Sequence, residues 1–488
     1  MSATIHPTSR TMPERWRAAT EPASLAAGGL ALGVGILAGL AVAASIWAAL
    51  AWSLGIVAVW LVLARPPFAI HALILITTLL PFGVIPLDVG LRPTLVDLAL
   101  FAIIASWAWH AGVQGEKTIA GLGVKLVVLF AGVVIVAASL GTAVASPSGR
   151  AIREVTTYAL VVLSSVATAR IALNLSFTVA IIRTLICASA CSAALGIAIW
   201  SLPPYTTIDV LSVLSPIGYP TGRDVLRYLP APNNTYSETL RATGTSIDPN
   251  VFGGMLMLGA TAALAQVASA RPVLPRLVLG LTIALTASAM YLSHSRSSWL
   301  GLAAAAALTA SVSCRRLWLA APPAVLALMA TGIGRDIVAR LVSGFTLQDR
   351  AAALRLDEYR QALSLIARYP VFGVGFFGSP ELGTFVGVSS IYLTVAEHAG
   401  LIGLTSFLAV VAWACWCVVA RWRHEPGLAP LAMTTLAMLA AILVAGAFDH
   451  YFVNPAFMHM VALLWTVLGI MLGTAQASSA DRAPTPQK

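Results

Sequence analysis

Apolar runs of about 20 residues, each long enough to cross roughly 30 Å of hydrocarbon, follow one another along most of the chain. Short polar turns separate them, and the pattern predicts an all-α polytopic membrane protein with about 12–14 transmembrane helices. The first run lacks a small-residue cleavage site and leads directly into further spans, so we expect it to be retained rather than removed as a signal peptide. The predicted spans are 24–43, 45–64, 67–86, 93–113, 123–144, 155–173, 176–200, 249–270, 276–293, 297–314, 317–333, 391–420, 428–447 and 452–473.

Two tails and two long polar loops separate the predicted transmembrane regions. We expect both tails to lie in the cytoplasm and both long loops to lie in the periplasm. The predicted regions are an N-terminal tail (1–23), an N-terminal transmembrane bundle (24–200), a first periplasmic loop (201–247), central transmembrane helices (248–333), a large periplasmic loop (334–390), C-terminal transmembrane helices (391–473) and a C-terminal tail (474–488).

The two long loops differ in the structure that their sequences predict. The first is rich in proline and poor in apolar runs, which predicts an irregular cap ending at Arg241. The second predicts an amphipathic helix with Asp349 as its N-cap, because apolar residues repeat at alternating spacings of four and three up to Pro370. The predicted apolar face of this helix consists of Ala352, Leu356, Tyr359, Leu363 and Ile366.

Composition excludes a single soluble domain, since 59% of the residues are hydrophobic and only 10% are charged. The five cysteines lie in or at the ends of predicted spans, so a disulfide framework is not expected. No GxGxxG-type loop and no metal-ligand cluster precedes a soluble fold in this sequence. We therefore expect no cofactor and no bound metal.

The basic residues predict the orientation of the chain in the membrane. They gather in the short turns on the side of the termini, and the three lysines, Lys117, Lys125 and Lys488, all fall there. The positive-inside rule then places that side in the cytoplasm. The net charge of +10 is thus spread over many turns, which argues against nucleic-acid binding. The long outer loops carry arginine without lysine, as expected for forked contacts to the phosphate or carboxylate of an anionic lipid-linked substrate.

Short motifs between residues 241 and 404 resemble one family of bacterial envelope enzymes. They are RATGTSIDPNVFGG (241–254), SHSRSSWLGLA (293–303), RYPVFGVGFFG (368–378) and IYLTVAEHAGLIGL (391–404). In this order and spacing they resemble the O-antigen ligase and O-antigen polymerase superfamily, and LRPTLVDLAL (91–100) agrees with it.

The resemblance implies a glycosyltransferase of the bacterial inner membrane with its active site on the periplasmic face. Its donor would be an undecaprenyl-diphosphate-linked glycan, and an acceptor hydroxyl would attack the anomeric carbon as the lipid diphosphate leaves. Members of this superfamily are expected to need no metal, and arginines stabilise the diphosphate. The implied partners are the donor glycan, a glycan acceptor, the lipid bilayer and a chain-length regulator protein.

Three arginines stand at or near positions that match this role: Arg241, Arg296 and Arg355. Each has a simpler alternative. Arg241 is also suited to anchoring a helix at the membrane interface. Arg296 joins two spans with almost no loop and must lie near membrane depth, while Arg355 is also suited to pairing with an acidic neighbour on its own helix.

Other polar residues have two interpretations that the sequence leaves open. Asp248 and Asn250 are candidates either for substrate binding or for capping the helix that follows them. Arg153 is a candidate either for substrate binding or for a structural polar link. Asp97 and Arg183 lie inside predicted spans, where they should face the bundle interior, paired with each other or with a neighbour.

The candidates for a general base are His294, Glu397, His398 and His450. His398 is equally suited to packing, and Asp449 is placed to orient His450. Ligases of the superfamily carry a His-Asn pair just before the span that follows the large loop, whereas this chain has Ser389-Ser390 there. The departure favours a polymerase of O-antigen or exopolysaccharide repeat units over an O-antigen ligase that transfers glycan to lipid A core or protein. A polytopic transporter or flippase is a third possibility, although no internal repeat is evident.

Overall fold

The computed structural model describes residues 65–85, 92–112, 121–230, 236–346, 350–378 and 387–477. The chain divides into two compact units, residues 1–65 and 66–488, and the following description concerns the second. The predicted spans 24–43 and 45–64 and the expected N-cap Asp349 lie outside the described residues.

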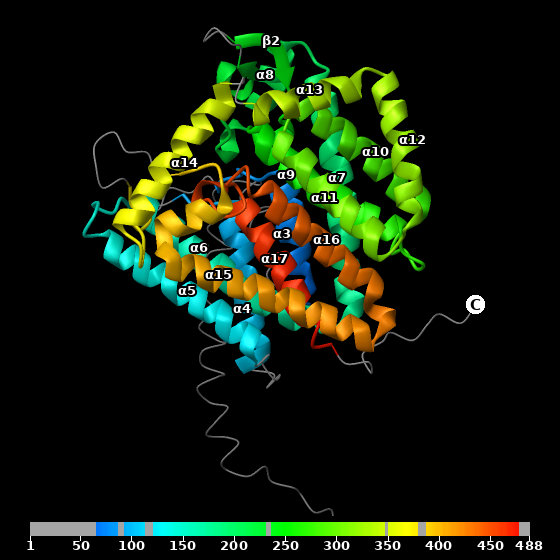
Figure 1. The fold of residues 1–488 in the computed structure, drawn as a ribbon. Coiled ribbons are helices and arrows are strands. Elements are labelled where there is room, and N and C mark those ends of the chain that lie inside the picture. Colours follow the sequence, from blue (N-terminus) through cyan, green and yellow to red (C-terminus); the bar gives the residue numbers. More distant parts are fainter. Residues whose placement is uncertain are drawn as a thin grey trace, which may run out of the picture. The chain divides into compact units, whose positions relative to one another are not determined.

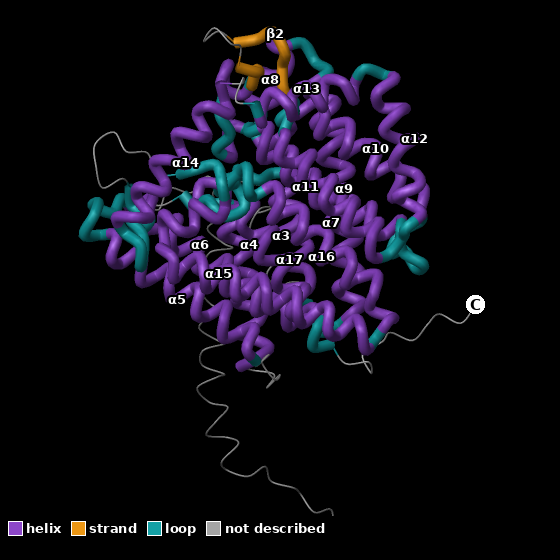
Figure 2. The backbone as a smooth tube through the Cα atoms, in the orientation of Figure 1, coloured by secondary structure: helices purple, strands orange, loops and turns teal. Residues whose placement is uncertain are grey.

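The described chain is built almost entirely of helices, with one small two-stranded sheet (Figures 1 and 2). Within the described ranges, nine helices are long and apolar enough to cross a membrane, which confirms the all-α polytopic class. The helices are α3 (Pro67–Leu79), α4 (Leu95–Gly112), α5 (Leu122–Gly141), α6 (Gly149–Ala172), α7 (Leu175–Trp200), α8 (Pro204–Ser212), α9 (Pro249–Val267), α10 (Arg276–Ser293), α11 (Arg296–Val312), α12 (Arg316–Ala330), α13 (Ile333–Phe345), α14 (Arg350–Arg368), α15 (Ile391–His424), α16 (Ala429–Ala445) and α17 (Met458–Thr474), and the strands are β1 (Arg227–Pro230) and β2 (Tyr236–Arg241).

Small residues let the long helices approach one another closely. Helix α17 packs along α6, and a Cβ added to Gly469 would lie 2.6 Å from the carbonyl oxygen of Ser165. Helix α11 packs along α16, where a Cβ on Gly301 would lie 2.7 Å from the carbonyl oxygen of Ala441. Because lipid offers no hydrophobic drive for association, such close backbone packing is a main source of stability between membrane helices.

The first long loop is more regular than the sequence predicts. It contains α8 and an antiparallel hairpin of β1 and β2, in which Arg227 pairs with Arg241. Pro204 stands at the first position of α8 and Pro230 is the last residue of β1. These prolines therefore begin and end short elements, where a missing N–H costs little, and the expectation of an irregular cap was wrong.

The predicted amphipathic helix in the second long loop is confirmed as α14, and its buried face overlaps the predicted one only in part. Ala362 and Leu365 are 0% and 3% exposed, whereas Leu363 is 57% exposed. The helix buries the side that carries Tyr359, because the phenol lies within 3.1 Å of the backbone carbonyls of both Ser389 and Ala447. These two polar contacts of Tyr359 help to orient α14, and the spacing of apolar residues in the sequence does not predict them.

Two predicted spans are shorter than the sequence suggests. The run 67–86 gives α3, which has 13 residues. The run 317–333 gives α12, which has 15 residues and contains Pro322 and Pro323. A proline inside a helix removes one backbone hydrogen bond. The next helix, α13, begins at Ile333, close to where the large loop was expected to begin.

Helix α15 is broken at Gly400, whose φ of 67° lies in the left-handed region. The glycine-rich segment after α14 lies against this break. Val374 donates its N–H to the carbonyl of Glu397 at 2.8 Å, and Leu401 donates to the carbonyl of Pro370 at 2.8 Å. Backbone groups that the break frees are thus paired with a neighbouring segment, as a membrane helix requires.

Candidate functional site

Three backbone segments meet at one end of the helix bundle, the end that carries α8, the hairpin and α13 (Figure 1). We call it the site end. The segment before α9 joins the turn between α10 and α11 where Ala242 donates its N–H to the carbonyl of Leu292 at 2.9 Å. That turn reaches the segment after α16 where the Ser297 hydroxyl donates to Asp449 at 3.5 Å. Two motifs far apart in the sequence, RATGTSIDPNVFGG and SHSRSSWLGLA, are therefore neighbours.

Arg241 lies at the centre of this junction, at the end of β2. Its Nε donates to the carbonyl of Ser293 at 2.8 Å and its Nη2 donates to Oδ1 of Asn250 at 2.6 Å. Burial lowers the pKa of Arg241 to about 10, Asp248 opposes this shift, and the charges of Arg340 and Arg296 add to it. The Arg241 guanidinium is still charged at neutral pH, and the positive charges of Arg340 and Arg296 lie close enough to act on it.

Arg296 and Arg340 bring these like charges from α11 and α13. Arg296 Nη1 donates to the backbone carbonyl of Arg340 at 3.4 Å. A Cβ on Gly344 would lie 2.6 Å from the same nitrogen, so α13 rests directly on the guanidinium. We refer to Arg241, Arg296 and Arg340 as the arginine cluster.

Asp449 is the buried acid beside this cluster, with 7% of its surface exposed. Burial raises its pKa, and the charges of His450 and Arg355 oppose the shift. Arg355, on α14, is therefore close enough to Asp449 for its charge to act there, and its role in substrate binding stays a prediction. Next to Asp449, the phenol of Tyr451 is buried, which raises its pKa.

Asp248 and Asn250 have the roles of helix cap and arginine ligand. Oδ1 of Asp248 accepts the N–H groups of Asn250 and Val251 at 2.8 and 3.0 Å, so it caps α9. Asn250 uses its own Oδ1 to hold Arg241. The capping interpretation is thus confirmed for Asp248, whereas Asn250 positions a guanidinium of the cluster.

His294 lies in the turn between α10 and α11, with a left-handed φ of 54°. Burial lowers its pKa to about 4, and the charges of Arg340 and Arg241 add to the shift. The imidazole is therefore neutral at physiological pH. A base whose pKa lies this far below the working pH accepts a proton weakly, which makes His294 a poor candidate for proton removal.

His450 is not oriented by Asp449, contrary to the sequence-based prediction. Asp449 Oδ1 accepts the backbone N–H of His450 at 3.0 Å, rather than the ring. The His450 Nδ1 atom is buried and has no hydrogen-bond partner among the described residues. The ring lies 6.1 Å from that of Phe457. The aspartate thus shapes the turn and leaves the imidazole to packing contacts.

His398 lies deeper, on α15. Its Nδ1 is 2.8 Å from the carbonyl of Thr394, one turn earlier, and its ring centroid lies 4.9 Å from that of Phe376. It lines a small cavity whose other walls are mainly apolar, including Phe130 and Tyr158. This environment agrees with the packing role that the sequence left open.

Glu397 and Glu358 hold the short segment that leads into α15. Glu397 is 1% exposed and accepts the N–H of Gly387 at 3.3 Å. Glu358, on α14, accepts both the N–H and the hydroxyl of Ser389, at 3.0 and 2.7 Å. At the position where ligases carry the His-Asn pair, this chain thus has Ser389, which is hydrogen-bonded to the Glu358 carboxylate of the large loop.

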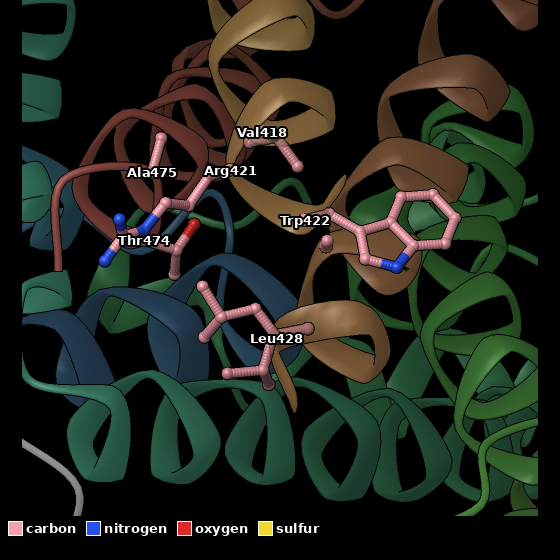
Figure 3. A pocket seen from close by; sticks show the side chains of 8 residues that line it. Val418, Arg421, Trp422, Leu428, Thr474 and Ala475 are labelled. Carbon is pink, nitrogen blue, oxygen red and sulfur yellow. The ribbon is translucent and has the colours of Figure 1, made fainter. Parts of the chain in front are cut away.

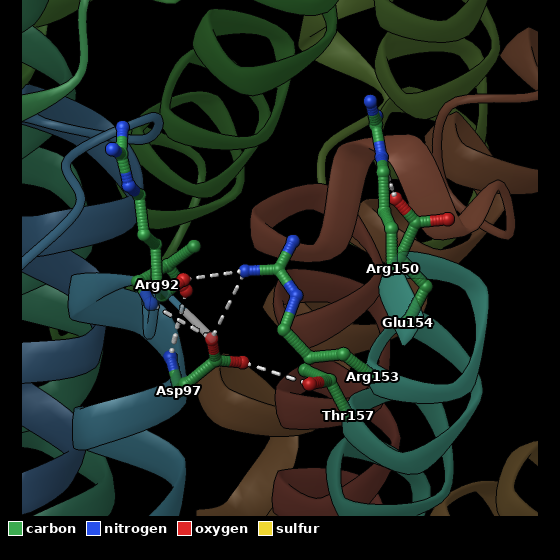
Figure 4. A network of polar contacts seen from close by, with 7 residues as sticks. Arg92, Asp97, Arg150, Arg153, Glu154 and Thr157 are labelled. Atoms are coloured by element: carbon green, nitrogen blue, oxygen red, sulfur yellow. Dashed lines mark hydrogen bonds and ion pairs between the residues drawn. The ribbon is translucent and has the colours of Figure 1, made fainter. Parts of the chain in front are cut away.

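Arg153 joins a separate network at the start of α4 and α6 (Figure 4). It donates to the carbonyl of Arg92 at 2.8 Å and pairs with Asp97 at 3.9 Å, while the Thr157 hydroxyl donates to Asp97 at 2.8 Å. Of the two alternatives that the sequence left open, Asp97 pairs with a neighbour, Arg153, rather than with Arg183. Arg183 donates to the carbonyl of Val273 at 2.6 Å. The structural interpretation of Arg153 fits these contacts.

A small pocket at the opposite end of the bundle contains another arginine (Figure 3). Arg421 pairs there with Glu425 at 2.8 Å and donates to the carbonyl of Ala477 at 2.7 Å. Trp422 and Leu428 line the same pocket. The charge of Arg421 is paired and most of the pocket lining is apolar. We therefore interpret the pocket as packing between helix ends rather than as an anion site.

Sequence reasoning missed several residues of the site. Arg340 belongs to the cluster, and its only sequence signal is that it is one of the arginines in the large loop. Glu358 was considered only as a partner for Arg355. Ser297 and Tyr451 carry no sequence signal that separates them from ordinary polar residues at helix ends. Among the described residues, no group of three or more His, Cys, Asp or Glu side chains is placed to hold a metal ion.

Comparison with known families supports the resemblance. Residues 281–408 match the family model described as O-Antigen ligase. The chain is similar to the O-antigen ligase and polymerase superfamily over this segment. No curated protein matches the chain. The matched segment contains the turn with Arg296, all of α13 and α14, and the broken part of α15, so it covers much of the site described above.

Proposed function

We propose that this chain is an inner-membrane glycosyltransferase that uses an undecaprenyl-diphosphate-linked glycan as donor at the periplasmic face and polymerises O-antigen or exopolysaccharide repeat units. The family match supports glycosyl transfer of the O-antigen ligase or polymerase type in general. The assignment of the donor rests on the arginine cluster, and the choice of a polymerase rests on Ser389-Ser390.

The observation that carries the proposal is the clustering of like charge. Arg241, Arg296 and Arg340 lie close enough to influence one another, and all three are partly shielded from solvent. Several guanidinium groups held close together create a positive potential that attracts an anion with more than one negative charge. Asp248 and Asp449 are the acids that act on Arg241, and three guanidinium groups lie beside them. A lipid diphosphate carries several negative charges on oxygens that match the guanidinium fork.

The cluster is suited to the leaving group of glycosyl transfer. The acceptor oxygen forms a bond to the anomeric carbon while the bond from that carbon to the diphosphate oxygen breaks. The diphosphate leaves with the electron pair, and its charge rises in the transition state. Fixed cationic donors in a poorly hydrated site stabilise such developing charge most effectively. The reaction needs no metal for this role, so we expect it to proceed in excess EDTA.

The orientation of the chain agrees with a periplasmic donor site. Arg170, Arg276, Arg421 and Lys125 belong to the ends of helices that lie away from the site end. The positive-inside rule places that opposite side in the cytoplasm and therefore the arginine cluster in the periplasm. Undecaprenyl-linked glycans that have crossed the membrane would meet the cluster there.

Variants of the cluster test the donor site. Arg241→Ala and Arg296→Ala should abolish surface polymer while protein level and membrane insertion stay normal, and Arg→Lys should rescue poorly because an ammonium cannot form the fork. Arg335→Ala is a matched control, since Arg335 is an exposed arginine on the same helix as Arg340. Full activity in either cluster variant would remove that arginine from the site.

An O-antigen ligase is the second candidate, favoured by the description of the matching family. Ser389-Ser390 in place of a His-Asn pair favours the polymerase. Deletion of the gene followed by sizing of carrier-linked glycan separates the two. Loss of a polymerase leaves single repeats, whereas loss of a ligase leaves long chains on the carrier. Unchanged glycan together with a defect in solute uptake would favour a transporter. A chain-length regulator is a proposed partner of the polymerase alone.

A further inference from the structure

Helix α14 carries a carboxylate close to the turn that contains Asp449, the buried acid beside the arginine cluster. Glu358 follows Arg355 by three positions, so both side chains lie on one face of the helix. The charge of Arg355 acts on Asp449 beside the cluster. The next residue, Tyr359, places its hydroxyl 3.1 Å from the carbonyl of Ala447, two residues before Asp449. These contacts fix Glu358 close to the turn that holds the buried acid.

Two bonds from one residue orient the Glu358 carboxylate. Ser389 donates both its N–H and its hydroxyl to the same oxygen, Oε2, at 3.0 and 2.7 Å. The hydroxyl of Tyr359 lies 3.1 Å from the carbonyl of Ser389, so the serine is itself held in place. With Oε2 occupied by two donors, the lone pairs of Oε1 are directed elsewhere. A carboxylate held in this way is positioned to accept a proton from a third group.

Access to solvent separates Glu358 from the other acids near it. Glu397 is 1% exposed and Asp449 is 7% exposed, so neither offers an open oxygen to an incoming acceptor. Asp357 is 63% exposed but pairs with Arg360 on the outer side of α14. Glu358 is partly exposed. It alone among these four combines fixed geometry with access.

We propose that Glu358 is the catalytic base that removes the proton from the acceptor hydroxyl, an inference that rests on the proposed glycosyl transfer. The acceptor O–H bond breaks and its proton moves to Glu358 as the oxygen forms its bond to the anomeric carbon. The bond to the diphosphate oxygen breaks in the same displacement. Ser389 is a positioning residue, because it acts through the carboxylate.

Azide provides a direct test, because it attacks an anomeric carbon without losing a proton. The donor is carrier-linked glycan extracted from cells that lack this chain, and the full-length protein is assayed in lipid vesicles. Glu358→Gln should lower transfer to the glycan acceptor about 10²–10⁴-fold, the usual contribution of a general base. The same variant should form glycosyl azide at a rate similar to that of the wild type.

The outcomes distinguish the base from the rest of the mechanism. Equal loss of both reactions in Glu358→Gln would show a structural role and overturn the proposal, as would full retention of glycan transfer. If the wild-type protein consumes no donor in either reaction, the proposed function fails as well. Asp357→Asn is the matched control, since it removes the adjacent carboxylate on the exposed side of α14, and it should change neither reaction.

A rescue experiment keeps the test valid if the glutamine variant folds poorly. Glu358→Ala leaves space for a small carboxylate, so added formate should restore part of the glycan transfer in a concentration-dependent manner. Ser389→Ala should lower kcat more than it changes KM, because it removes one of the two bonds that orient the base. Absence of formate rescue in a variant with a normal Tm would contradict the proposal.

Discussion

Arg296 donates a hydrogen bond to the backbone carbonyl of Arg340 at 3.4 Å, so one contact holds two residues of like charge beside each other. Arg296 begins α11, a helix of the bundle, whereas Arg340 belongs to α13 in the large loop. The loop therefore supplies part of the cluster, and the cluster is complete only when α13 is seated on the bundle.

Arg340→Ala should weaken donor binding. Loss of one charge-assisted hydrogen bond costs about 1.5–3 kcal/mol, which corresponds to a rise of roughly 10- to 100-fold in KM for the carrier-linked glycan. The measurement is steady-state transfer in vesicles over a range of donor concentrations. Arg335→Ala, on the same helix, should leave KM unchanged, and an unaltered KM in Arg340→Ala would exclude the residue from the donor site.

Gly373 and Gly400 should each be intolerant of alanine. A Cβ on Gly373 would lie 2.8 Å from the nitrogen of Gly400, and one on Gly400 would overlap the backbone of Val371. Both residues have positive φ, so alanine adds backbone strain of about 1–3 kcal/mol. We expect a clear fall in Tm of the detergent-purified protein. Gly132→Ala is the control, because nothing lies within 4 Å of a Cβ there, and an unchanged Tm in Gly400→Ala would contradict the close packing.

His294 should make the protein less stable in mild acid. Its pKa is about 4 in the folded state, against 6.5 for the free side chain, so the unfolded chain binds more protons between these values. Stability from this group is complete above pH 6.5 and is lost as the pH falls toward 4. His294→Asn should flatten the dependence of Tm on pH in this window, and asparagine tolerates the left-handed backbone at this position. An identical slope in the variant would show that other groups control it.

Arg153→Ala should affect stability rather than donor binding. The side chain joins α6 to Asp97 at the start of α4 and to the carbonyl of Arg92. Its removal leaves a partly buried carboxylate with fewer partners, which lowers Tm, while KM for the donor should stay as in the wild type. A raised KM at normal Tm would instead return Arg153 to the substrate site.

The orientation can be tested with reporter fusions in the two long loops. A fusion at Pro232, between β1 and β2, and another at Glu381, after α14, should be active only as periplasmic enzymes. The expectation follows from the basic bias of the short turns on the other side. Cytoplasmic activity at both positions would reverse the chain and remove the argument for a lipid-linked donor.

Hydropathy predicted the fold class and many of the helices, because each span must satisfy its own backbone within one continuous segment. The prediction from hydropathy was wrong where the structure depends on contacts between residues that are far apart in the sequence. In α14, Tyr359 contacts two backbone carbonyls that hydropathy does not register. Leu363, which the apolar spacing placed on the buried face, is exposed. Helix α12 continues past its proline pair and ends at Ala330, before Gly332, whose φ of 84° is left-handed.

Part of the candidate site was expected from the sequence. Arg241, Arg296 and Arg355 stood in or near recognisable motifs, and the structure brings all three to the site end. Arg340 and Glu358 lie in the large loop with no motif of their own. Their significance depends on which part of the bundle the loop covers, and a single sequence does not contain that information.

The break in α15 has a consequence for the order in which the chain matures. The segment that lies against it, from Pro370 to Gly375, precedes Glu397 and Leu401 in the sequence and so leaves the ribosome before its hydrogen-bonding partners exist. Until α15 arrives, the backbone groups of that segment must remain hydrated. A nascent chain that stops before residue 397 therefore lacks the partners of this segment, which forms its hydrogen bonds only after the first part of α15 has been made.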